Sequence, residues 1–154
     1  MNADQDPRLD RDCFSRHIGE TPGRMSTIRV VTLLSAPIPN RIGQVFIPVR
    51  DMDRAIAWYT RLLGLPAQTP THEGTIYDLP AVGDVGLALD ANQPDFTADG
   101  PPRFFWWADD LEAVRAHLET LQVDVVGDVQ DIGSVSFVQF RDPDGNLLMV
   151  CARN

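Results

Sequence analysis

The sequence predicts an α+β fold in which one module of strands and a helix occurs twice. In each half a short strand pattern leads into an amphipathic helix that begins at an aspartate, Asp51 in the first half and Asp110 in the second. The two aspartates are 59 residues apart, a period too long for a solenoid repeat and suitable for a duplicated α+β module. Further short strand patterns separated by turns follow each helix.

The composition is typical of a soluble globular protein. The chain has 154 residues, of which 44% are hydrophobic and 23% charged, and no apolar run approaches the roughly 18 residues of a membrane span. All 13 basic residues are arginines, which excludes a lysine Schiff base and the phosphate-binding lysine of a P-loop. Because the net charge of −9 would repel phosphate backbones, we expect no nucleic acid partner, and the lack of a span predicts no membrane partner.

The cysteines and the N-terminal residues predict a cytoplasmic protein. Cys13 and Cys151 form neither a CxxC pair nor a disulfide framework, and the first 25 residues lack the apolar core of a signal peptide. Residues 1–24 are rich in charges and lack a periodic apolar face, so we expect a disordered tail before a single domain over 25–154. A short strand pattern at Ile28–Leu34 opens that domain.

The first module is predicted over residues 44–90. Gln44–Val49 is a strand pattern, Asp51 is an N-cap candidate, and Gly64 ends a helix. The apolar residues of that helix recur at helical spacing: Met52, Ala55, Ile56, Tyr59, Leu62 and Leu63. Two strands follow, at Thr75–Leu79 and Val85–Asp90.

The second module is predicted over residues 103–151 in the same order. A strand at Arg103–Ala108 precedes the cap candidates Asp109 and Asp110, and the helix that follows carries Leu111, Val114, Leu118 and Leu121 on one face. The remaining strands are Val123–Val126, Val135–Arg141 and Asn146–Cys151. The Asp142-Pro-Asp-Gly145 segment between the last two favours a tight hairpin turn.

Three segments resemble the vicinal oxygen chelate superfamily, which includes glyoxalases, bleomycin resistance proteins and extradiol dioxygenases. They are Gln44–Asp51 with Ala55–Gly64, Arg103–Ala113, and Phe140–Asn146. The resemblance implies two paired βαβββ modules that form a curled, mostly antiparallel sheet around a cavity, with the helices outside. It also implies a homodimer, because members commonly complete their cavities through a second chain.

Metal-dependent members of the superfamily hold one divalent ion with four side chains. The resemblance places those positions at Gln44, Ala88, Arg103 and Met149. Gln44 is an acceptable ligand, but an alanine has no donor, an arginine repels a cation, and a thioether suits a hard ion poorly. We therefore predict no metal and no other cofactor.

No other pattern predicts a catalytic site. His17, His72 and His117 are not at ligand spacing, and the sequence contains no GxSxG, HExxH or GxGxxG motif. Cys151 lies in an apolar strand, where a thiol is usually buried and unreactive. We accordingly predict no catalytic residues.

Strand alternation predicts which side chains face a ligand in the cavity, because residues two apart share a face. The predicted ligand-binding residues are Gln44, Phe46, Arg103, Phe105, Trp107 and Met149. By the same alternation Phe104 and Trp106 belong to the core. Three interpretations of Arg103 are open: it holds a ligand carboxylate or phosphate, it pairs with a neighbouring acid such as Asp90, or it lies at an exposed strand end.

The leading interpretation is a metal-free binding protein of the bleomycin-resistance type that takes a small, flat organic molecule with an anionic group. The alternative is a lyase, isomerase or dioxygenase-like enzyme. Such an enzyme would either use a rearranged metal site that includes Gln44 and His72 or Glu73, or act without metal.

Overall fold

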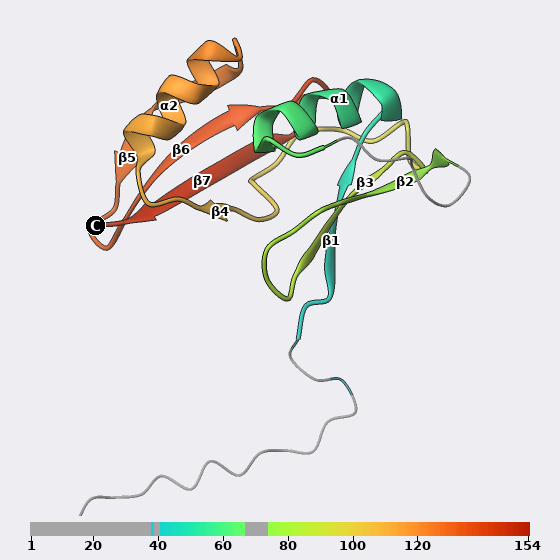
Figure 1. The fold of residues 1–154 in the computed structure, drawn as a ribbon, viewed down its shortest axis with the longest axis horizontal. Coiled ribbons are helices and arrows are strands. Elements are labelled where there is room, and N and C mark those ends of the chain that lie inside the picture. The colour runs from blue at the N-terminus through green and yellow to red at the C-terminus, as the bar shows by residue number, and fades with distance from the viewer. Residues whose placement is uncertain (1–37, 39–40, 67–73) are drawn as a thin grey trace, which may run out of the picture. The chain divides into compact units, whose positions relative to one another are not determined.

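The computed structural model describes residues 38, 41–66 and 74–154 (Figure 1). The chain divides into two compact units, residues 1–38 and 39–154, and every described helix and strand belongs to the second. Four features predicted from the sequence lie outside the described residues: the tail at 1–24, the strand at Ile28–Leu34, and the candidate metal ligands His72 and Glu73.

The first sheet is built from residues 44–90. It contains β1 (Gln44–Pro48), β2 (Ile76–Leu79) and β3 (Gly86–Asp90) in the order β1-β3-β2, with β1 parallel and β2 antiparallel to β3. Its strands agree with those predicted to within one residue at each end. The described residues of this module form three strands, whereas the resemblance implies four.

Helix α1 (Met52–Leu63) begins and ends where the sequence predicts. The Asp51 side chain accepts a hydrogen bond from the backbone N–H of Arg54 at 3.0 Å, which satisfies one of the free donors at the helix start. Gly64 ends the helix with φ 63°, a left-handed conformation that costs glycine little because it has no Cβ.

The second sheet contains β4 (Trp106–Trp107), β5 (Asp124–Asp131), β6 (Val135–Arg141) and β7 (Leu147–Arg153) in the order β4-β7-β6-β5. Helix α2 (Leu111–Thr120) is capped by the Asp110 side chain, as predicted. The strand predicted at Arg103–Ala108 is too long, since only two of its six residues pair with β7.

β5 runs five residues beyond the predicted strand, because the ladder resumes after a register shift between Val126 and Gln130. β7 likewise reaches Arg153 instead of ending at Cys151. The predicted hairpin turn is confirmed: the Gly145 N–H donates to the Asp142 carbonyl oxygen at 3.0 Å.

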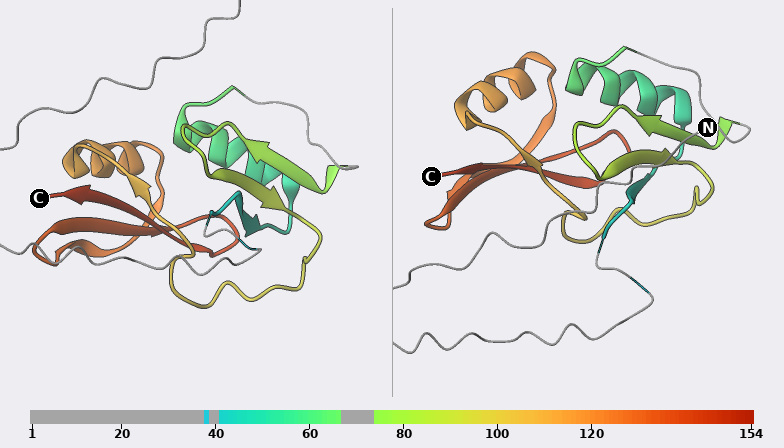
Figure 2. Two further views of the ribbon diagram at one scale, coloured as in Figure 1. Left: turned by 90° about the horizontal axis from the view of Figure 1, so that it is seen from below. Right: turned by 60° about the horizontal axis from the view of Figure 1, so that its bottom comes forward.

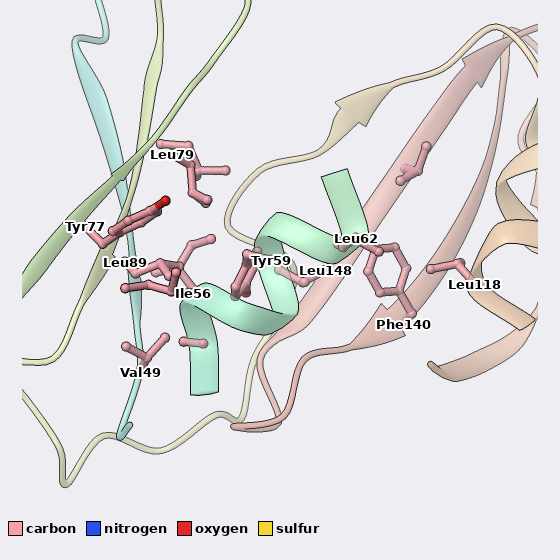
Figure 3. Close-up of a cluster of buried hydrophobic side chains, with 14 of the residues drawn as sticks. Val49, Ile56, Tyr59, Leu62, Tyr77, Leu79, Leu89, Leu118, Phe140 and Leu148 are labelled. Carbon is pink, nitrogen blue, oxygen red and sulfur yellow. The ribbon is translucent and has the colours of Figure 1, made fainter. Parts of the chain in front are cut away.

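Each helix packs on its own sheet, α1 against β2 and β3 and α2 against β6 and β7, and both lie on the same side of the strands (Figure 2). Buried residues of both modules form a single hydrophobic cluster. Figure 3 shows α1 between Tyr77 and Leu89 of the first sheet and Phe140 and Leu148 of the second. The fold is therefore α+β, as the sequence predicts, and its two sheets do not close into a barrel.

The faces of the second sheet also follow the predicted alternation. Phe104 and Trp106 pack against the hydrophobic cluster, and Phe105 and Trp107 are exposed on the opposite, open face. None of the helices in the described part of the chain is both long enough and apolar enough to cross a membrane.

Candidate functional site

The open face of the second sheet carries an exposed aromatic surface. Phe105 and Trp107 are 43% and 53% exposed, and their rings meet edge to face with centroids 4.9 Å apart. Trp107 lies opposite Cys151 in the ladder, and Cys151 lies opposite Phe137, so these side chains share the open face. Met149 is two residues before Cys151 and points the same way. We call the set Phe105, Trp107, Phe137 and Met149 the aromatic face.

An open hollow of about 300 Å³ adjoins the aromatic face. It is lined by Trp107, Ala108, Asp109 and Arg153. The guanidinium carbon of Arg153 lies 5.1 Å from the centroid of the Trp107 ring, within the range of a cation–π contact. The predicted ligand residue Trp107 therefore has a cationic neighbour, but that neighbour is Arg153. Sequence reasoning misses this residue because the apolar pattern of the last strand ends at Cys151.

Arg103 lies in a different place from the one that strand alternation suggests. It precedes the paired residues of β4 and lines a separate cavity of about 30 Å³ with residues that include Asp99, Phe104 and Asn146. Such a volume has room for about one water molecule. The suggested partner Asp90 instead accepts hydrogen bonds from Asn92, and no hydrogen bond or ion pair joins Arg103 to another described residue.

Gln44 and Phe46 lie on β1 in the first sheet. Phe46 is 46% exposed, and Gln44 Nε2 donates to Asp78 Oδ1 at 2.7 Å. Gln44 reaches β2 across Gly86, where a Cβ would lie 3.3 Å from Gln44 Cγ. Sequence reasoning misses Asp78 because its position beside Gln44 depends on the order β1-β3-β2. Neither described hollow includes Gln44, Phe46, Phe105 or Met149.

The four metal positions implied by the resemblance do not fit a divalent ion. Gln44 offers one amide oxygen, since its Nε2 donates to Asp78, but Ala88 is fully buried without a donor and Arg103 is a permanent cation. Met149 offers only a thioether, which approaches Gln139 Nε2 at 4.0 Å. Across 41–66 and 74–154, no three His, Cys, Asp or Glu side chains are grouped so that they could hold a metal ion.

The Asp142–Asn146 turn joins the two modules through side-chain hydrogen bonds. Tyr59 of α1 donates its hydroxyl hydrogen to Asp142 Oδ2 at 2.7 Å, and both residues are buried. Asn146 Nδ2 donates to Asp142 Oδ2 at 2.7 Å and to the Pro48 carbonyl oxygen at 2.9 Å. Burial, reinforced by the Asp142 charge, raises the pKa of Tyr59 well above its usual value, so the phenol stays a donor.

Asp144 strengthens the same junction through two arginines of the first module. Arg54 Nη2 lies 2.6 Å from Asp144 Oδ1, and Arg50 Nη1 lies 3.5 Å from the same oxygen. Arg50 also donates to the backbone carbonyl oxygens of Asp144 and Phe96. Because the Asp144 side chain is buried and needs a charged partner, its bonds to Arg50 and Arg54 help to hold the modules together.

The Cys151 thiol is buried, and the His117 imidazole makes a hydrogen bond between the helices. Cys151 is a buried free thiol, and burial raises its pKa, so it is protonated near neutral pH. His117 Nε2 lies 2.9 Å from the Leu62 carbonyl oxygen and links α2 to α1.

Comparison with known proteins agrees with this architecture. The family model for the glyoxalase/bleomycin resistance protein/dioxygenase superfamily matches residues 41–150. No curated protein sequence matches the chain.

Solved structures share the fold at low sequence identity. TnmS3, an antibiotic binding protein from Streptomyces sp. CB03234, is 25% identical with a TM-score of 0.60, the match covering 78% of this chain and all of TnmS3. A lactoylglutathione lyase from Agrobacterium tumefaciens is 24% identical with a TM-score of 0.59, covering 74% of this chain and 94% of the lyase. A glyoxalase/bleomycin resistance protein from Catenulispora acidiphila is 23% identical with a TM-score of 0.57, covering 72% and 96%. This chain therefore belongs to the glyoxalase/bleomycin resistance protein/dioxygenase superfamily.

Proposed function

We propose that this protein binds a small aromatic organic molecule on the aromatic face, without a metal ion. The observation that carries the proposal is the exposure of Phe105 and Trp107, since about half of each large ring is open to solvent beside a hollow. Burying such rings against a flat ligand removes apolar area from water and adds an aromatic contact. Met149 supplies an adaptable apolar side chain next to them.

The first sheet contributes a second group of ligand-binding residues in this proposal. Gln44 keeps its amide oxygen as an acceptor, because its Nε2 donates to Asp78, and Phe46 adds an exposed ring. Arg103 remains a proposed contact at the end of the small cavity. The similarity to TnmS3, an antibiotic binding protein, supports a binding role.

A neutral dye, N-phenyl-1-naphthylamine, tests the proposal because its fluorescence rises on an apolar surface. We expect Trp107→Ala to weaken binding about tenfold, the loss of one aromatic contact together with its buried area. Val82→Ala removes an exposed apolar side chain from the turn between β2 and β3 and serves as the control. If Trp107→Ala binds the dye as tightly as the Val82 variant, the aromatic face is not the binding site.

We also propose that the protein is a cytoplasmic homodimer. Exposed rings on both sheets, Phe46 and Trp107 among them, support a second chain that covers part of this surface. Light scattering at micromolar concentration should give twice 17.1 kDa, and a 17.1 kDa particle would contradict the dimer.

A further inference from the structure

Arg153 is the last residue of β7 and lies beside the aromatic face. In the ladder it pairs with Val135, and alternation along β7 places it on the same face as Cys151 and Met149. Its guanidinium carbon is 5.1 Å from the centroid of the Trp107 ring. The strand thus carries a permanent cation to one end of the exposed rings.

A guanidinium that lies over a ring keeps its N–H donors available at its edge. The Arg153 guanidinium lies over the Trp107 ring, and its N–H groups point outward in the plane of the group. Within the described residues, the Arg153 side chain has no hydrogen-bond acceptor or ion-pair partner, whereas Arg50 and Arg54 are bonded to Asp144. Such a fork matches the two oxygens of a carboxylate, sulfonate or phosphate.

The hollow between Arg153 and Asp109 gives space for that anionic group. Its volume of about 300 Å³ is about ten times that of the cavity at Arg103, so it has room for a carboxylate, sulfonate or phosphate beside Arg153. Asp109 lines the same hollow and repels an anion by its charge. Substitution of Asp109 and of Arg153 should therefore change the affinity for an anionic ligand in opposite directions.

We propose that Arg153 binds the oxyanion of an aromatic acid whose ring lies on the aromatic face. The inference rests on the proposed function and goes beyond it by naming the anionic ligand class and the residue that selects it. It assigns to Arg153 the role that the sequence suggested for Arg103.

Two dyes with the same ring system test the inference: 1-anilinonaphthalene-8-sulfonate carries a sulfonate, and N-phenyl-1-naphthylamine does not. We expect Arg153→Ala to weaken the sulfonated dye by about three- to tenfold and to leave the neutral dye within about twofold. The range is modest because an exposed ion pair contributes little in water. Arg153→Lys should bind the sulfonated dye with an affinity between those of Arg153→Ala and the unaltered protein, since lysine keeps the charge and loses the paired N–H donors.

A variant with the same loss of charge serves as the control. Arg115→Ala on the exposed surface of α2 should bind the two dyes like the unaltered protein. Asp109→Asn should strengthen the sulfonated dye about twofold, because it removes the opposing charge.

The inference is overturned if Arg153→Ala and Arg115→Ala bind the sulfonated dye equally, or if Arg103→Ala weakens it more than Arg153→Ala. Failure of the proposed function gives a different result: Trp107→Ala would then bind both dyes with the affinity of the unaltered protein. All variants change exposed side chains, so equal melting temperatures will confirm that the fold is intact.

Discussion

The hydrogen bond between Tyr59 and Asp142 provides the sharpest test of how the two modules hold together. Tyr59→Phe removes one oxygen atom and leaves the packing of the ring unchanged. Tyr59 is completely buried, and its partner is a charged acceptor at 2.7 Å. Hydrogen bonds to charged groups contribute about 1.5–3 kcal/mol.

The structure favours the lower half of that range. Asp142 keeps three other donors after the substitution, the backbone N–H groups of Asp144 and Asn146 and the Asn146 side chain, so its carboxylate is not left unpaired. We therefore expect Tyr59→Phe to lower the free energy of unfolding by about 2 kcal/mol at pH 7. For a chain of this size that corresponds to a fall in melting temperature of about 6 °C.

The pH dependence gives an independent check. Burial and the Asp142 charge raise the pKa of Tyr59 in the folded protein, whereas in the unfolded chain it ionises near pH 10. The contribution of Tyr59 is therefore complete below about pH 10 and falls as the pH rises further, by about 1.4 kcal/mol at pH 11. Phenylalanine does not titrate, so Tyr59→Phe does not lose this contribution. The difference in free energy of unfolding between the two proteins should therefore fall from about 2 kcal/mol at pH 7 to below about 1 kcal/mol at pH 11.

Urea unfolding at pH 7, 9 and 11, followed by circular dichroism, measures both effects. A double-mutant cycle that combines Tyr59→Phe with Asp142→Asn should give a coupling energy of about 1.5 kcal/mol. The reasoning is refuted if Tyr59→Phe is as stable as the unaltered protein at pH 7, or if its deficit is the same at pH 7 and pH 11.

Three further predictions concern the junction, the N-terminus and the metal positions. Arg54→Ala should lower the free energy of unfolding, measured in urea, by about 1–2 kcal/mol, because Asp144 is buried and loses its 2.6 Å partner. Arg61→Ala on the same helix should lower it by less than about 0.5 kcal/mol. Removal of residues 1–24 should leave the melting temperature within about 2 °C, since that segment lacks a periodic apolar face, and a larger fall in calorimetry would show that it docks. Elemental analysis of the purified protein should find far less than one transition metal per chain, and one bound metal that is lost on Gln44→Ala would favour the enzyme alternative.

The sequence alone is sufficient for the features that depend on neighbours in the chain. The bounds of α1 follow from Asp51, whose side chain reaches an N–H three residues on, and from Gly64, which tolerates a positive φ. The division of the aromatic run into core and open faces follows from the alternation of a strand, which is why the exposure of Phe105 and Trp107 is predictable from their spacing.

Tertiary structure decides the features that depend on strand order and on contacts between distant residues. Arg103 lies outside the paired strand because β4 pairs over two residues only, and Arg153 takes the place beside Trp107 because β7 runs on past Cys151. The Asp142–Asn146 turn is recognisable as a hairpin, but its bond to Tyr59 spans 83 positions. No local pattern of hydrophobicity or turn propensity encodes such a contact, because its energy exists only once the two modules have packed against each other.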